Sequence, residues 1–97
     1  MRKVILLSGA KADIREASRF YEAERPGFGD LFLTRFHQAL SQVREYPLTA
    51  PTIYGQYRRM GLKQFSHSIV YSVEANQVVV VAVLHNRRNP DYWKRRI

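Results

Sequence analysis

The sequence predicts an α+β fold: an N-terminal strand, an α-helical hairpin, then a three-stranded antiparallel meander and a short C-terminal tail. Three observations support this prediction. Two segments with helical spacing of apolar residues follow one another in the first half, an alternating stretch occupies 64–73, and a run of seven apolar residues occupies 78–84. A hydrophobic content of 45% and a charged content of 25% are ordinary for a globular domain, so we expect one domain over residues 1–97.

The chain opens with a short apolar stretch that we expect to form the first strand, at residues 3–7. A secretory signal needs an apolar run of about 7–15 residues, and the run at 4–7 has only four. No stretch approaches the roughly 20 apolar residues of a membrane span. We therefore expect no membrane partner.

Two helices should follow, joined by a short loop that contains Pro26 and Gly27. The first is expected over residues 11–24 with Ser8 as its cap, and the second is expected to begin at Asp30 as its cap and to end before Pro47. The expected buried stripes are Ala10, Ile14, Ala17 and Tyr21 in the first helix and Phe32, Phe36, Ala39, Leu40 and Val43 in the second.

The second half predicts the antiparallel meander. Residues 48–56 are expected to be irregular, residues 57–62 to form a strand, and residues 64–73 to form the next strand. In that strand one face should meet the helices, and the other, with Ser66, Ser68 and Ser72, should be open. Residues 74–76 suit a hairpin turn in which Asn76 adopts a positive φ. The valine-rich run at 78–84 suits a strand buried on both faces.

A basic corner follows this buried strand directly, with the order His85, Asn86, Arg87, Arg88. A rigid strand that delivers an imidazole and two guanidiniums to one edge makes this corner the first candidate site. The competing explanation is a strand that leaves the core through a solvated basic turn. Residues 1–50 hold eight Lys and Arg and six Asp and Glu, whereas residues 51–97 hold eight and two. This excess favours an acidic partner, although charge for solubility alone would also explain it.

Several classes of chemistry are not indicated by the sequence. Cysteine is absent, which excludes disulfides and thiolate nucleophiles. The histidines His37, His67 and His85 lack metal-ligand spacing, and there is no glycine-rich phosphate loop, so we expect no metal and no cofactor. His37 is expected on the surface, and His67 is expected as a satisfied histidine of the core or its border.

The tail should form one or two helical turns, with Asn89 as cap and Pro90 at the first helical position. Tyr92 and Trp93 should anchor these turns on the sheet. Residues 94–96, all Lys or Arg, would then add positive charge beside His85.

The order of elements and several short strings resemble the RelE/ParE superfamily of bacterial toxins, over nearly the whole chain. The strings are Ala12-Asp13-Ile14, Tyr21, Gly29 to Phe32 leading into Phe36, Tyr46-Pro47, Arg58-Arg59, Ile69-Val70-Tyr71, and the run from Val83 to Pro90. The closing string, followed by Trp93 and Arg96, is most similar to the ParE branch or the plasmid-stabilisation proteins grouped with it.

The resemblance implies a cytoplasmic toxin of a type II toxin–antitoxin system. It implies a cognate antitoxin of the ribbon–helix–helix type that neutralises the toxin in a hetero-oligomer. The ParE branch is associated with inhibition of DNA gyrase and of replication. The RelE branch cuts messenger RNA on the ribosome.

The two branches demand different chemistry. RNA cleavage needs a base, an acid and stabilisation of the phosphorane charge. For the ribonuclease alternative the matching residues are Arg59, His85, Arg87 and Tyr92. The lysine pair of RelE-like sites has no match here, and no glutamate lies between Glu45 and Glu74. We therefore expect no catalytic residues and a non-catalytic, gyrase-binding toxin.

A partner-binding surface is expected instead, built from the basic corner, one strand of the meander and the tail. Its expected members are Arg58, Arg59, His85, Arg87, Arg88, Trp93, Arg95 and Arg96. A third alternative is a nucleic-acid-binding module without toxicity, which would stack bases on aromatic rings interleaved with Arg. Only Tyr57, Tyr92 and Trp93 would suit that role.

Overall fold

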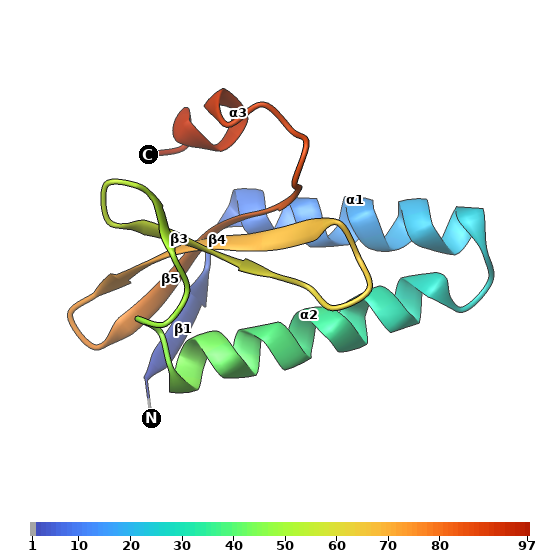
Figure 1. The fold of residues 1–97 in the computed structure, drawn as a ribbon. Coiled ribbons are helices and arrows are strands. Elements are labelled where there is room, and N and C mark those ends of the chain that lie inside the picture. Colours follow the sequence, from blue (N-terminus) through green and yellow to red (C-terminus); the bar gives the residue numbers. More distant parts are fainter. Residues whose placement is uncertain (1) are drawn as a thin grey trace.

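The computed structural model describes residues 2–97 (Figure 1). The elements are β1 (Lys3–Leu6), α1 (Ser8–Glu24), α2 (Phe28–Glu45), β2 (Thr52–Tyr54), β3 (Tyr57–Gly61), β4 (His67–Glu74), β5 (Gln77–His85) and α3 (Asp91–Lys94). The α+β architecture is as expected: a strand, a helical hairpin, a meander and a short tail. Among the helices described, none is long and apolar enough to cross a membrane.

The five strands form one sheet in the order β1-β5-β4-β3-β2. The valine-rich strand β5 lies inside the sheet, antiparallel to β4 and parallel to β1. The meander has one strand more than predicted, because residues 52–54 pair with β3 and are not irregular. A bulge between Val70 and Tyr71 shifts the register of β4 against β5. This shift changes which side chains of β5 face each side of the sheet.

The helical hairpin is as predicted, but its caps are not. Ser8 is the first residue of α1, and in neither α1 nor α2 does the side chain of the N-cap residue make a capping hydrogen bond. The Glu22 carboxylate instead accepts hydrogen bonds from the backbone N–H groups of Gly27 and Gly29. Asp30 lies within the first turn of α2, where its negative charge interacts favourably with the positive end of the helix dipole.

The two helices cover one face of the sheet and form the larger core (Figure 1). Phe32 and Phe36 of α2 pack with Ile69 and Tyr71 of β4, and all four are at most 2% exposed. The Tyr71 hydroxyl donates a 2.6 Å hydrogen bond to the Pro47 carbonyl, which ties the end of the hairpin to the sheet. Burial raises the pKa of Tyr71.

The opposite face of the sheet is covered by the C-terminal tail, so the expectation that it is open is wrong. Val70, Ala82, Leu84 and Trp93 form a second, smaller core there. Ser68 and Ser72 are also buried, at 3% and 0% exposed. Ser66 does not belong to β4 and is exposed.

The hairpin between β4 and β5 also differs in detail. Ala75 has the positive φ, 54°, in place of Asn76. The turn has only two residues between the strands, which demands left-handed backbone regardless of which residue supplies it. The other expected positions hold: His37 is exposed and His67 is buried.

Candidate functional site

The tail returns across the sheet from the end of β5, through residues 86–90, into α3. Asn89 Oδ1 accepts a 3.0 Å hydrogen bond from the Asp91 N–H, but α3 begins at Asp91 with Pro90 at its N-cap position, one residue later than predicted. Trp93 is 4% exposed and contacts the rings of Tyr54 and Tyr57. One tryptophan therefore fixes the tail to the sheet.

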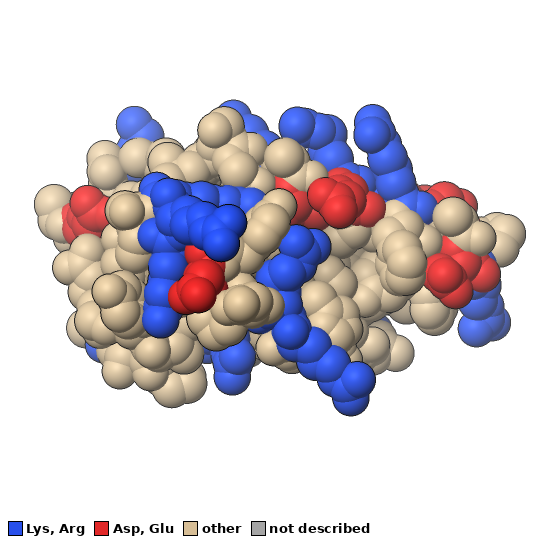
Figure 2. All heavy atoms as spheres, turned by 90° about the horizontal axis from the view of Figure 1, so that it is seen from above, with Lys and Arg blue, Asp and Glu red and all other residues tan. Residues whose placement is uncertain are grey.

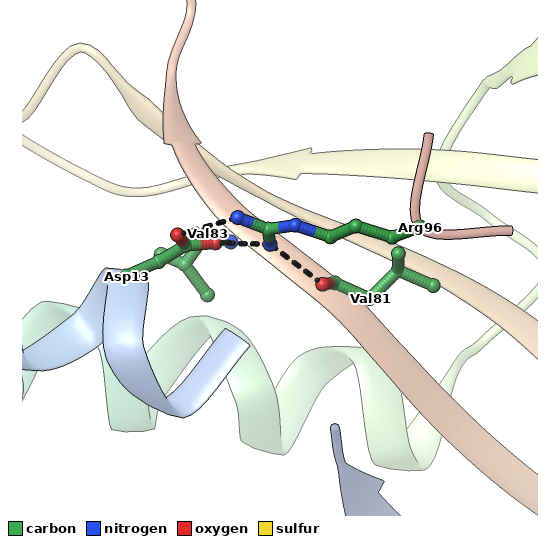
Figure 3. Close-up of polar contacts among 4 residues, drawn as sticks. All are labelled: Asp13, Val81, Val83 and Arg96. Carbon is green, nitrogen blue, oxygen red and sulfur yellow. Dashed lines mark hydrogen bonds and ion pairs between the residues drawn. The ribbon is translucent and has the colours of Figure 1, made fainter. Parts of the chain in front are cut away.

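A second attachment is the ion pair between Asp13 of α1 and Arg96 of the tail (Figure 3). Asp13 Oδ2 accepts from Arg96 at 2.7 Å and from the Val83 N–H at 3.0 Å, and Asp13 Oδ1 accepts from Arg96 at 2.9 Å. Arg96 also donates to the Val81 carbonyl at 3.0 Å. The hydrogen bonds to Asp13 raise the pKa of Arg96 above its ordinary value. We call this arrangement the Asp13–Arg96 clamp.

The clamp occupies the edge that the short strand β1 leaves uncovered. β1 pairs with β5 only as far as Val80, although β5 continues to His85. The backbone groups of Val81 and Val83 would otherwise lie unpaired in a largely buried setting, which is costly. A carboxylate and a guanidinium therefore supply the hydrogen bonds that a longer β1 would have made.

A small cavity lies between the tail and the sheet, with a volume of about 160 Å³. Its lining includes Val70, Leu84 and Trp93 from the smaller core, together with Ser68 and Asn86. The Ser68 hydroxyl donates to Asn86 Oδ1 at 2.5 Å, so this part of the wall is held by a side-chain hydrogen bond. We call this cavity the tail pocket.

Positively charged side chains surround the tail pocket. Arg59 of β3, Arg88 after β5 and Lys94 of α3 all line it, and His85 contributes an imidazole. Arg87 and Arg95, which lie next to these residues in the sequence, are exposed. Figure 2 looks down on this face and shows a central cluster of Lys and Arg side chains with an acidic side chain beside it, while further Lys, Arg, Asp and Glu side chains are spread over the rest of the view. We call Arg59, His85, Arg87, Arg88, Lys94 and Arg95 the basic edge.

Tyr92 is held between two guanidiniums of this region. The Arg88 guanidinium lies 4.3 Å from the Tyr92 ring centroid and that of Arg96 lies 5.1 Å from it. Such contacts attract a cation to the face of a ring and fix both side chains. Tyr92 is 40% exposed, so it packs between cations and does not anchor the tail on the sheet.

The two strand-end histidines are neighbours, with ring centroids 5.3 Å apart. His67 Nδ1 lies 3.1 Å from the Tyr21 hydroxyl, and burial lowers the pKa of His67 to about 4. His67 is therefore a neutral, satisfied core histidine at neutral pH, as expected. His85 Nδ1 accepts a 3.1 Å hydrogen bond from the Arg87 N–H.

Three of the expected partner-binding residues are engaged in contacts within the protein. Arg58 donates to the carbonyls of Leu48 and Ala50 and so holds the loop after α2. Trp93 is buried, and Arg96 is engaged in the clamp. The other expected residues, Arg59, His85, Arg87, Arg88 and Arg95, lie on the basic edge.

Sequence reasoning did not assign a role to Asp13 or a pocket-lining role to Ser68, and it included Asn86 and Lys94 only as members of the basic corner and of the charge beside it. A signal for Asp13 was present, because it falls between Ala10 and Ala17 on the buried stripe of α1. A carboxylate at a buried helix position requires a partner. Nothing local in the sequence points to Arg96, 83 residues away, as that partner.

A second groove, of about 280 Å³, lies between α1 and the end of β5. Glu16 and Phe20 of α1 line it together with His67, His85 and Arg88. Phe20 is 57% exposed, so this groove has an apolar rim on the helix side. Within residues 2–97, no group of three or more His, Cys, Asp or Glu side chains could hold a metal ion.

Two solved structures share this fold. One, described as the chromosomal ParDE TA system from P. aeruginosa, aligns with a TM-score of 0.66 and 14% identity over 88% of this chain and 96% of that chain. The other, a copper-bound L66S mutant toxin from Helicobacter pylori, aligns with a TM-score of 0.65 and 16% identity over 92% of this chain and 100% of that chain. At these identities the likeness concerns the fold.

The sequence comparison goes further than the fold. No curated protein matches the chain. A family model described as the ParE toxin of the type II toxin–antitoxin system, parDE, matches residues 4–90. This match covers the helical hairpin and the sheet from the second residue of β1 to the end of β5, but not α3. The chain therefore belongs to the ParE toxin family of type II toxin–antitoxin systems.

Proposed function

We propose that this protein is a toxin that inhibits DNA gyrase by binding it through the basic edge, without catalysis. The observation that supports this proposal most is the composition of the tail pocket: its lining holds Arg59, Arg88 and Lys94 and no carboxylate. Such a surface attracts an acidic partner and orients it. It does not need to transfer a proton in order to trap an enzyme.

The geometry around Tyr92 and the histidines supports binding over catalysis. Tyr92 is stacked between two cations, and His67 is neutral, buried and bonded to Tyr21. A ribonuclease would need a free base and a free acid placed on opposite sides of one phosphate. The tail pocket offers His85 alone for both roles.

We propose further that a cognate antitoxin of the ribbon–helix–helix type neutralises the toxin in a hetero-oligomer in the cytoplasm. An amphipathic helix of the antitoxin would cover the helical hairpin, where Phe20 is exposed, and an extended acidic piece would reach the sheet. Residues 1–97 would then act as one toxin domain. Growth arrest by the toxin alone, relieved by co-expression of the antitoxin, would support this part.

The decisive experiment uses purified toxin in two reactions. In the first, DNA gyrase supercoils a relaxed plasmid, and we expect the toxin to inhibit this reaction and to accumulate cleaved DNA. In the second, ribosomes translate a messenger RNA, and we expect the RNA to stay intact. Cleaved messenger RNA together with unaffected gyrase would contradict the proposal.

One observation favours the ribonuclease alternative. Glu16 lines the second groove with His85 and Arg88, so a carboxylate and an imidazole border one concavity. In a ribonuclease, Glu16→Gln should lower the rate of cleavage by roughly 100-fold or more. In the gyrase-binding toxin, Glu16→Gln should leave inhibition of gyrase unchanged within about twofold.

A further inference from the structure

The tail pocket has a floor and a rim of different chemistry. Val70, Leu84 and Trp93 are each at most 8% exposed and form an apolar floor. Arg59, Arg88 and Lys94 lie on the rim. A ligand that satisfies both parts must combine an apolar group with negative charge.

The volume of the pocket limits the size of that ligand. Pockets for whole small molecules have about 300–1,000 Å³. The tail pocket, at about 160 Å³, accommodates one side chain or a group of similar size. It is therefore suited to one anchoring residue of a larger partner.

Nucleic acid fits the pocket less well. Stacking of a base needs an exposed aromatic face, and Trp93 is only 4% exposed. Tyr54 and Tyr92 are more exposed, but Lys94 lies 4.2 Å from the Tyr54 ring centroid and Arg88 lies 4.3 Å from that of Tyr92. A phosphate alone would use the cations and leave the apolar floor without a partner.

We propose that the tail pocket receives one apolar side chain from an extended, acidic segment of the antitoxin. Carboxylates on either side of this side chain would pair with Arg59, Arg88 and Lys94. This inference rests on the proposed neutralisation by an acidic antitoxin and names where its extended segment binds. The same cations that contact gyrase would then be covered in the neutralised complex.

The chain carries its own reporter for this site, because Trp93 is the single tryptophan and lies in the pocket wall. The probe is the blocked peptide Ac-Glu-Asp-Leu-Asp-Glu-NH₂, added to the intact toxin while tryptophan emission is recorded. We expect saturable binding. Replacing the leucine by serine should weaken binding at least about tenfold, because a buried leucine contributes roughly 1.5–3 kcal/mol.

Variants locate the peptide on the rim. Lys94→Gln and Arg59→Gln should each weaken binding about twofold to fivefold, the range for exposed ion pairs. Lys63→Gln is the matched control, because Lys63 is exposed after β3 and does not line the pocket. It should bind the peptide like the parent protein.

Two results would overturn the inference. One is unchanged tryptophan emission at about 10 mM leucine peptide, because a site with a Kd of about 10 mM or tighter would be at least half occupied there. The other is tighter binding of inorganic phosphate or of a short oligothymidylate than of the leucine peptide. The peptide assay contains no gyrase, so it is independent of the gyrase assay. Peptide binding by a toxin that does not inhibit gyrase would contradict the proposed target alone. Inhibition of gyrase without peptide binding would contradict the pocket alone.

Discussion

The two faces of the sheet are closed in different ways. Two helices of 17 and 18 residues cover one face, where Phe32, Phe36, Ile69 and Tyr71 are each at most 2% exposed. A four-residue helix and its flanking residues cover the other face, where Trp93 is the main anchor. The first face determines the fold. The second is thinly covered, and its incomplete closure leaves the tail pocket among the cations of the basic edge.

The attachments of the two layers differ as well. The helical hairpin is joined to the sheet by a broad apolar core, whereas the tail depends on one ring and one ion pair. A layer with few apolar contacts opens at a lower free energy than a broad core. Substitutions on the two faces should therefore separate stability from partner binding.

The largest expected effect is on the helix-covered face. Phe36→Ala removes a side chain that is 2% exposed, and we expect the free energy of unfolding to fall by about 3–5 kcal/mol. Urea unfolding followed by circular dichroism measures this change. The adjacent His37→Ala, on the exposed side of α2, should stay within about 0.5 kcal/mol of the parent protein. Equal effects at the two positions would contradict the assignment of the core.

A somewhat smaller effect is expected at the clamp. Asp13→Ala leaves the Val83 N–H without its acceptor and Arg96 without its anion, and we expect a loss of about 3 kcal/mol. Arg96 keeps some access to water, at 22% exposed, which limits the loss. Hydrogen exchange should show the amides of the tail losing more protection than those of β4.

The control for the clamp is Glu16→Ala, an exposed acidic residue one turn further along α1. It should change the free energy of unfolding by no more than about 0.5 kcal/mol. Protection of the tail that is unchanged in Asp13→Ala would mean that Trp93 alone holds the tail in place.

A third effect depends on pH and acts on the helix-covered face. Burial is the largest cause that lowers the pKa of His67 from 6.5 to about 4; His85 and Arg88 lower it further, while Asp13 opposes them. The unfolded chain binds this proton near pH 6.5, so stability is fully present above pH 6.5 and falls as the pH decreases toward 4. We expect a loss of about 2–3 kcal/mol between pH 7 and pH 4 from this group.

Urea unfolding at a series of pH values tests the role of His67. In His67→Gln the decline toward pH 4 should be shallower by about the same 2–3 kcal/mol. His37→Gln, on the exposed surface, should keep the slope of the parent protein. An unchanged slope in His67→Gln would show that other groups cause the acid dependence.

Local patterns predicted most of the fold. The apolar stripes predicted α1 and α2, and the apolar run at 78–84 predicted the buried strand β5. Pairings between distant segments were not predictable in the same way. Nothing in residues 3–7 specifies a parallel strand beside β5, and the three residues of β2 are too few to show alternation.

The candidate site was predicted in part. His85, Arg87 and Arg88 were expected at one edge because they directly follow a buried strand, and the structure places Arg59 in the lining of the same pocket as His85 and Arg88. Trp93 was expected both as an anchor of the tail and as a partner-binding residue, and the structure confirms the first of these roles. The role of Arg96 was not predicted, since its partner Asp13 is distant in the sequence. Once the tail covers the sheet, the ring becomes a core residue and the guanidinium becomes the partner of Asp13.

The smallest expected effects test the central claim that the basic edge binds a partner and transfers no proton. His85→Gln removes the titrating group, and Tyr92→Phe removes a hydroxyl but keeps the ring between Arg88 and Arg96. The comparison variant is the double change Arg87→Ala and Arg88→Ala, which removes two charges of the edge. It should abolish toxicity under either mechanism.

The most direct measurement is growth arrest after induction of each variant, with messenger RNA and gyrase activity followed in the same cells. We predict that His85→Gln and Tyr92→Phe arrest growth like the parent protein, with intact messenger RNA and inhibited gyrase. In a ribonuclease each change would cost roughly 100- to 10,000-fold in rate. Loss of growth arrest in both variants, with messenger RNA cleaved only by the parent protein, would contradict this account.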